Sequence, residues 1–106
     1  MKQMDKVLSM IGMAARAGKV ATGEFSTEKA VKSGKGRLVI VACDASDNTR
    51  KMFRNMCNYY HVPMVEYSIK EELGRWTGNT YRASICILDE GFANALMKKL
   101  SLNMEV

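Results

Sequence analysis

The first segment of the chain is amphipathic. Apolar residues recur every three or four positions, with polar side chains between them, at Met4, Val7, Leu8, Ile11, Ala14 and Ala15. This spacing predicts a helix with one buried face. Arg16 suits the carboxyl end of that helix, and Gly18 is placed to stop it.

End signals mark a second helix. A short strand at 19–21 is expected before it. Thr22 and Gly23 then offer capping positions for a helix that runs through about Ser33. The glycine-flanked turn at 34–36 should end this helix and lead into the next element.

Two apolar runs predict buried strands. Residues 38–43 and 84–88 lack the alternation of a half-exposed strand, and the first is rich in β-branched side chains. Such runs are typical of strands that are covered on both faces. A further strand is predicted at 64–67, directly after Pro63, which prevents the preceding helix from continuing.

Three more helices occupy the intervals between these strands. The turn at 44–46 supplies a cap for the third helix. Its predicted buried stripe is Met52, Phe53, Met56, Cys57 and Tyr60. The segment 68–71 matches a capping box and starts a fourth helix that ends near Gly78. Asp89 caps the last helix. Its predicted inward residues are Phe92, Leu96 and Leu100.

The predicted order is therefore α-β-α-β-α-β-α-β-α. Helices that alternate with strands cover both faces of one sheet. We predict an α/β fold, a three-layer α/β/α sandwich with a mixed four-stranded sheet. A chain of 106 residues, 47% hydrophobic and 25% charged, suits a single domain over 1–106.

Composition limits the cellular location and the cofactors that can be expected. The longest strictly apolar run, 38–43, is far shorter than the roughly 20 residues that span a bilayer, and no export signal is visible. Three cysteines and the single His61 form no zinc-binding pattern. We expect a cytoplasmic protein with buried thiols, no membrane partner and no cofactor or metal.

Positive charge is concentrated in the first third of the chain. Residues 1–37 carry eight basic and three acidic side chains, whereas residues 38–106 carry eight of each sign. The first third therefore accounts for the whole net charge of +5. Such clustering suits contact with nucleic-acid phosphates, with a solvated basic face as the alternative.

The predicted strand ends offer little for catalysis. Asp89 and Glu90 are adjacent, and adjacent residues on a helix do not face one another. Cys43 and Asp44 follow a central strand, where a nucleophile can stand, but His61 falls in a distant turn. We predict no enzyme and no small-molecule substrate.

One loop combines an aromatic ring with a guanidinium. Tyr81 and Arg82 stand side by side before a buried strand. Such a pair can stack on an unpaired base and reach its phosphate. The alternative is a tyrosine packed on the sheet edge beside a solvated arginine. Trp76 is instead expected in the core or as a partial lid.

Several short segments recur in one order and spacing over nearly the whole chain. They are Gly18-Lys19, Thr22-Gly23, Lys29-Ala30-Val31, Gly34-Lys35 with Leu38–Ala42, Leu73-Gly74 with Gly78, and Tyr81-Arg82. Together they resemble the kink-turn-binding ribosomal-protein superfamily, of the large-subunit protein seven-Ae and thirty-e type. Further segments are similar to its small bacterial YlxQ-like branch, namely Ala42–Thr49, Cys57–Tyr60 with Val62-Pro63, and Asp89–Ala93.

This resemblance implies binding to a kink-turn, a sharply bent RNA duplex in which a bulge adjoins sheared G·A pairs. It implies that Gly23 lets the backbone approach the RNA, that Lys29 meets phosphate and that Asp44 contacts a base or sugar. Tyr81 and Arg82 would cover an extruded nucleotide. The implied RNA-binding set is Lys19, Thr22, Gly23, Glu24, Phe25, Ser26, Lys29, Lys35, Asp44, Tyr81 and Arg82.

The chain departs from the family pattern at one point. Kink-turn binders of the archaeal type place Asn-Glu two and three residues after this glycine, whereas here Phe25 and Ser26 stand there. Phenylalanine cannot replace hydrogen bonds to base edges, so weaker binding or a different bent RNA is an alternative. We expect Phe25 to be a core anchor, with a stacking role as the alternative.

We therefore predict a monomeric RNA-binding accessory of translation or the ribosome. Its expected partner is structured, kink-turn-like RNA, with ribosomal RNA as one source. The alternative function is a protein-interaction module that docks on a ribosomal or transcription partner, through Phe25 if that ring is exposed.

Overall fold

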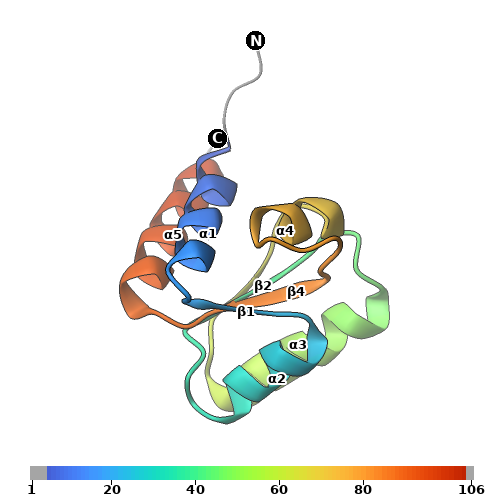
Figure 1. Ribbon diagram of the computed structural model, residues 1–106. Helices are drawn as coiled ribbons and strands as arrows, with labels where there is room; N and C mark the ends of the chain where they lie inside the picture. The colour runs from blue at the N-terminus through green and yellow to red at the C-terminus, as the bar shows by residue number, and fades with distance from the viewer. Residues whose placement is uncertain (1–4, 105–106) are drawn as a thin grey trace.

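The computed structural model describes residues 5–104, in which helices and strands alternate as the sequence predicts (Figure 1). The helices are α1 (Lys6–Arg16), α2 (Glu24–Lys32), α3 (Asp47–Tyr60), α4 (Lys70–Trp76) and α5 (Glu90–Met104). The strands are β1 (Val20–Thr22), β2 (Leu38–Val41), β3 (Met64–Glu66) and β4 (Ser84–Ile87). The predicted start of the first helix at Met4 lies outside the described residues.

The four strands form one mixed sheet in the order β1-β4-β2-β3. β3 runs parallel to β2, and β4 runs antiparallel to both of its neighbours. Consequently β1, β2 and β3 finish at the same end of the sheet at which β4 begins. We call this the near end, where Val41 lies opposite Ser84. At the opposite or far end, Val20 and Leu38 flank Ile87.

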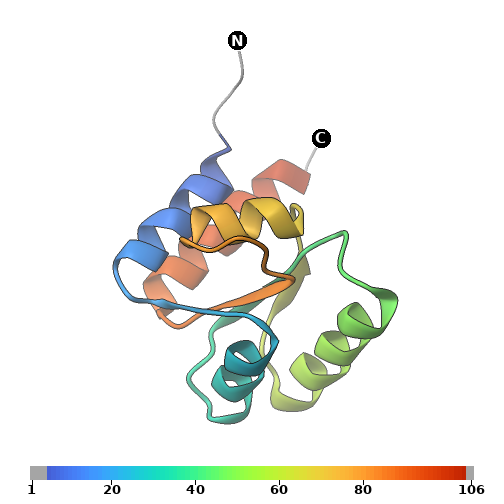
Figure 2. The ribbon, with the colours of Figure 1, turned by 45° about the vertical axis from the view of Figure 1, so that its right-hand side comes forward.

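Helices cover both faces of this sheet. α1, α4 and α5 lie on one face, whereas α2 and α3 lie on the other (Figures 1 and 2). All four residues of β2 and of β4 are buried, because each strand is covered on both sides. The predicted three-layer sandwich and the two buried strands are confirmed. Tyr60 departs from the predicted stripe of α3, since its side chain is 39% exposed at the last turn.

Two helix caps follow their local sequence signals. Ser46 Oγ accepts a hydrogen bond from Thr49 N at the start of α3, at 3.1 Å. Asp89 Oδ2 accepts one from Phe92 N at the start of α5, at 2.9 Å. Each bond satisfies a backbone donor that the helix itself leaves free.

The capping box predicted at 68–71 is wrong. Ile69 occupies the cap position of α4 without a side-chain bond, and Ser68 has a positive φ of 65°. The cap comes from another part of the chain instead, because Asp44 Oδ1 accepts a hydrogen bond from Lys70 N at 2.8 Å. The loop after β2 and the start of α4 meet at the near end of the sheet.

The thiols divide into two classes. Cys43 is exposed, which corrects the prediction that all thiols are buried. Cys43 lies in the turn between β2 and α3, two positions beyond the last residue of the buried strand. Cys57 and Cys86 are buried, and burial raises the pKa of each thiol to about 11 because it penalises the thiolate.

Residues 5–104 contain neither a membrane-spanning helix nor a metal-binding cluster. Among the helices of residues 5–104, none is long and apolar enough to cross a membrane. Within the same residues, no group of three His, Cys, Asp or Glu side chains is placed to hold a metal ion.

Candidate nucleic-acid interface

The near end of the sheet brings the start of α2 against the loop that precedes β4. Gly23 N donates a hydrogen bond to Ser84 O at 2.9 Å, which joins the end of β1 to the beginning of β4. Gly23 has a φ of 92°, a conformation that favours glycine. A Cβ at this position would lie 3.9 Å from Arg82 Cδ, so the two segments are in contact.

Arg82 ties this junction together. Its Nε donates to Thr22 Oγ1 at 3.3 Å, and its Nη2 donates to Asn79 Oδ1 at 3.0 Å. A third bond runs from Nη1 to the carbonyl oxygen of Tyr81 at 2.7 Å. The partly buried guanidinium therefore holds the loop at 77–83 in place through these hydrogen bonds. The alternative of a solvated arginine is wrong.

Tyr81 projects from this loop with 60% of its surface exposed. The backbone beneath it is held in place by a close approach to α4, since a Cβ on Gly74 would lie only 2.8 Å from Tyr81 N. Asn79 N also donates to Gly74 O at 2.8 Å. A fixed backbone with an outward ring is an arrangement on which a base can stack.

The exposed side of α2 carries the next group of candidate residues. Thr27, Ala30 and Val31 form its buried face. Phe25 lies on the opposite side and is 77% exposed, so the prediction of a core anchor is wrong. A residue two positions before Thr27 falls about 200° away around the helix, which carries its side chain away from the sheet.

Phe25 borders a groove that runs along α2 and the edge strand β1. The groove has a volume of about 290 Å³. Its apolar floor consists of Ala21, Ala30 and Leu88, and its rim includes Phe25, Ser26, Ser33, Lys29 and Lys35. Lys29 is exposed and forms no ion pair within the described residues, so its charge is available on the rim.

Two of the predicted site residues lie elsewhere. Lys19 O accepts a hydrogen bond from Leu88 N at 2.8 Å, which places Lys19 at the far end of the sheet. Lys35 follows the last turn of α2 and also lies at that end, where it borders the groove. The structure therefore brings together Thr22, Gly23, Glu24, Phe25, Ser26, Tyr81 and Arg82 at the near end.

Asp44 is exposed at the near end, but one of its oxygens already caps α4. Two further residues of the near end were not predicted from the sequence. Asn79 accepts a hydrogen bond from Arg82. Gly74 has no side chain, so the loop at 77–83 can pack closely against α4. The Gly-Asn pair at 78–79 is a turn signal, but it does not reveal which side chain the turn will bind.

Several basic residues on the helices form ion pairs. Lys32 Nζ lies 2.7 Å from Glu28 Oε2. The hydrogen bond and the negative charge of Glu28 raise the pKa of Lys32. On α3, Arg50 and Arg54 both form ion pairs with Glu66. Within the described residues, Lys51 of α3 stays exposed without an ion pair, and the rim of the groove carries two such cations, Lys29 and Lys35.

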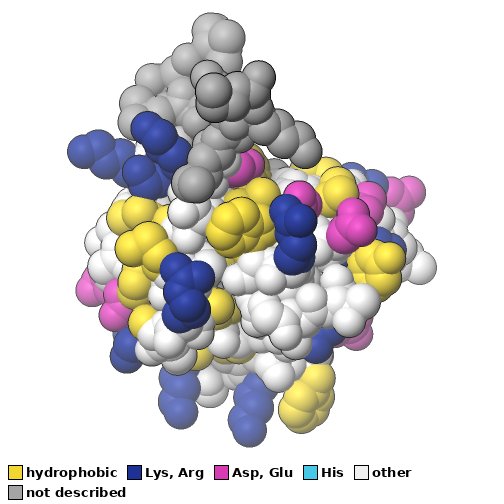
Figure 3. Space-filling view, turned by 45° about the horizontal axis from the view of Figure 1, so that its top comes forward, with side chains coloured by type: hydrophobic (Ala, Val, Ile, Leu, Met, Phe, Trp, Pro, Cys, Tyr) yellow, Lys and Arg dark blue, Asp and Glu magenta, His cyan; other side chains and the backbone are white. Residues whose placement is uncertain are grey.

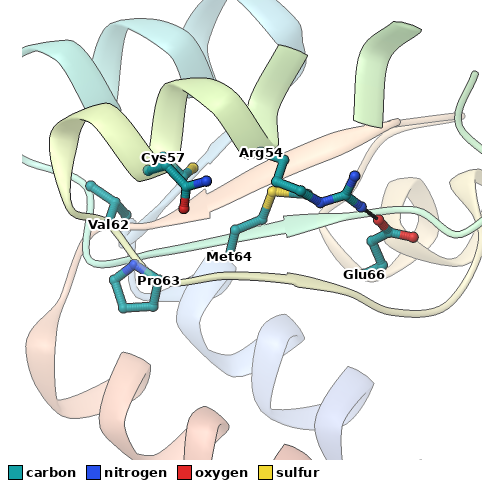
Figure 4. A pocket seen from close by; sticks show the side chains of 7 residues that line it. Arg54, Cys57, Val62, Pro63, Met64 and Glu66 are labelled. Carbon is teal, nitrogen blue, oxygen red and sulfur yellow. Dashed lines mark hydrogen bonds and ion pairs between the residues drawn. The ribbon is translucent and has the colours of Figure 1, made fainter. Parts of the chain in front are cut away.

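A separate hollow of about 540 Å³ lies between α3 and β3 (Figure 4). The side chains of Cys57 and Met64 line it, and Arg54 closes one side through its ion pair with Glu66. β3 is the edge strand farthest from β1, so this hollow stands apart from the near-end cluster.

Comparison with known proteins agrees with the fold. Residues 5–97 match the model of the ribosomal protein L7Ae/L30e/S12e/Gadd45 family. RNA-binding protein YlxQ of Bacillus subtilis (strain 168) is 38% identical over 91 residues, which cover 86% of this chain and 91% of that protein. RNA-binding protein YlxQ of Enterococcus faecium is 40% identical over 89 residues, 84% of this chain and 85% of its own.

Two solved structures share the architecture. A Bacillus halodurans protein of unknown function has a TM-score of 0.89 at 36% identity, covering 92% of this chain and 99% of its own. The Giardia lamblia 15.5kD RNA binding protein has a TM-score of 0.76 at 22% identity, covering 94% of this chain and 89% of its own. At that lower identity the likeness concerns the fold alone.

Proposed function

Because the chain belongs to the ribosomal protein L7Ae/L30e/S12e/Gadd45 family, we propose that it is a non-catalytic RNA-binding protein that recognises kink-turn-like RNA. The relatives named RNA-binding protein YlxQ, which match over most of their length, support the RNA partner. The protein acts in the cytoplasm as a monomeric single domain over 1–106, accessory to the ribosome or translation, and needs no cofactor.

The observation that carries this proposal is the junction of α2 with the loop at 77–83. Among the residues that the structure describes, no side chain caps the amino end of α2, so its first backbone N–H groups remain available to an acceptor on the RNA. Tyr81, whose ring is exposed, directly precedes Arg82 in the chain, and Arg82 donates a hydrogen bond to Thr22 beside this helix end. Backbone donors and a stacking ring on one surface suit an RNA with an extruded base.

Recognition rests on RNA shape more than on base edges. Phe25 has no hydrogen-bonding group in its side chain, and Ser26 has only a short hydroxyl. The two side chains therefore offer few bonds with which to distinguish one base from another. The exposed Phe25 ring instead provides a second aromatic surface at the start of α2.

A gel-shift titration tests this proposal. The protein should bind a kink-turn RNA more tightly than a control duplex of equal length and base composition without the bulge. Both titrations are run at one stated salt concentration, because phosphate contacts make affinity salt-dependent. Equal affinity for the two RNAs would defeat recognition by shape.

A protein-interaction module is the second candidate, and the exposure of Phe25 favours it. A ring that is 77% exposed is a common anchor of protein interfaces. Under this alternative, a ribosomal or transcription partner should co-purify after nuclease treatment, and Phe25→Ala should abolish the association. Loss of all partners on nuclease treatment would instead support binding through RNA.

A further inference from the structure

Basic side chains without ion pairs gather at the far end of the sheet. Lys19 precedes β1, and Lys35 and Arg37 precede β2. All three are exposed, and none forms an ion pair within the described residues. Figure 3 shows separate Lys and Arg side chains along the lower margin of the face that it draws.

The backbone holds this end of the sheet in a defined arrangement. Leu88 N donates to Lys19 O, and Arg37 N donates to Ile87 O, both at 2.8 Å. Lys19 and Arg37 therefore flank the end of β4 from its two neighbouring strands. The turn before β2 is pressed onto the sheet at Gly36, where a Cβ would lie 2.7 Å from the sulfur of Cys86.

The groove beside α2 connects the two ends of the sheet. Its rim includes Phe25 at the start of α2, Lys29 in the middle and Lys35 beyond the end. α2 has nine residues, so this rim is about 14 Å long at 1.5 Å per residue. A chain of phosphates laid along the groove would meet positive charge at its middle and at its far end.

Acidic groups at the far end face the other layer. Asp89 and Glu90 follow β4 and begin α5, which packs on the sheet face opposite to α2. Asp89 Oδ2 is also engaged by Phe92 N. On the α2 side, Glu28 is paired with Lys32. The positive charges of the unpaired cations beside the groove are therefore not neutralised by these acidic groups.

We propose that Lys19, Lys35 and Arg37 form a second phosphate-binding surface for the same RNA. It contacts the backbone of a duplex stem that leaves the bend at the near end and continues along the groove to the far end. This inference rests on the proposed function. It adds a second contact between the protein and the RNA, which forms only when one stem is long enough to reach the far end.

The test compares three kink-turn RNAs in salt titrations: a minimal one, and two in which one stem or the other is extended by a helical turn. One extension should tighten binding, and the other should not. The double variant Lys35→Gln/Arg37→Gln should remove that gain, roughly three- to tenfold, and lower the salt slope by about 1 to 2. It should weaken binding of the minimal RNA less than it weakens binding of the RNA with the longer stem.

The variant Lys6→Gln/Lys98→Gln is the matched control, since it removes the same charge from exposed positions on α1 and α5. It should keep the gain from the longer stem. Circular dichroism melting establishes that both variants remain folded. Equal binding of all three RNAs by the unaltered protein, or equal losses in the two variants, would overturn the second surface. Equal affinity for kinked and unkinked RNA would instead overturn the proposed function.

Discussion

Gly74 lies so close to Thr80 that a Cβ on the glycine would stand 2.6 Å from the carbonyl carbon of the threonine. Helix α4 and the loop at 77–83 therefore touch backbone to backbone, directly beneath Tyr81. Gly74→Ala should lower the free energy of unfolding by roughly 1–3 kcal/mol, because overpacking forces backbone shifts. Urea unfolding measures this change.

A second glycine provides the control for that substitution. Gly91→Ala places the same methyl group in α5, where the nearest atom is the carboxylate oxygen Asp89 Oδ2 at 3.1 Å. A side chain can move aside more easily than a backbone, so this variant should lose less stability. Equal losses at the two positions would contradict the structural role of Gly74.

The cap of α4 gives a second prediction. Asp44→Ala should lower the free energy of unfolding by about 1 kcal/mol, because Lys70 N loses its acceptor. Ser68→Ala should have no such effect, since the Ser68 side chain makes no cap bond. Thermal unfolding of the RNA-free protein compares them. A larger loss for Ser68→Ala would mean that the local capping box operates after all.

Tyr81 offers a test of base stacking. Tyr81→Ala should weaken binding of a kink-turn RNA by roughly 1–3 kcal/mol, the usual loss when a stacked ring is removed. Tyr59→Ala is the matched control, because Tyr59 is likewise exposed but lies at the end of α3. Fluorescence anisotropy titrations measure both affinities. Unchanged affinity in Tyr81→Ala would move the stacking site elsewhere.

Lys29 tests the electrostatic part of the interface. Lys29→Glu should weaken RNA binding and lower the slope of log affinity against log salt by about 1, as expected for one lost phosphate contact. Lys98→Glu changes the net charge equally at an exposed position of α5 and should have a smaller effect. A salt slope that falls equally in both variants would show that only net charge matters.

The buried thiols make stability depend on alkaline pH. Their pKa is about 11 in the folded protein against 9.0 for a free thiol, so folding favours the protonated form. The stabilising effect is fully present below pH 9 and is lost as the pH rises through about 11. Urea unfolding should therefore show falling stability between these two values, more steeply than in a Cys57→Ala variant.

The same thiols should differ in reactivity. At pH 8, iodoacetamide should modify the exposed Cys43 in the folded protein, whereas Cys57 and Cys86 should react only after unfolding. Mass spectrometry of the peptides reports each site. In Cys43→Ser, the folded protein should stay unmodified. Rapid modification of Cys86 would contradict its burial beneath the 34–36 turn.

Much of the architecture can be predicted from short stretches of sequence. The apolar runs around Leu38–Val41 and Ser84–Ile87 identify two buried strands, and the caps at Ser46 and Asp89 are confirmed. These features depend on periodicity, or on hydrogen bonds that span three residues. Their physical causes therefore lie within the segment that shows them.

The wrong predictions of residue position share one cause. Phe25 is apolar and was expected in the core, but the sheet selects which side of α2 is buried. Lys19 and Lys35 are close in sequence to the start or end of α2, yet they emerge at the far end of the sheet. Neither outcome can be read from local pattern, because strand order determines which loops share an end.

Composition, periodicity and family motifs were sufficient to establish an α/β/α sandwich with its positive charge near the amino end. The candidate interface required distant segments to meet. Arg82 donates a hydrogen bond to Thr22, which is 60 positions away in the sequence. Asp44 accepts one from Lys70, 26 positions away, and so caps α4. These bonds join loops that are far apart in the sequence. The loops meet because β2 and β4 are buried side by side between two layers of helices, and local sequence preferences do not predict that meeting.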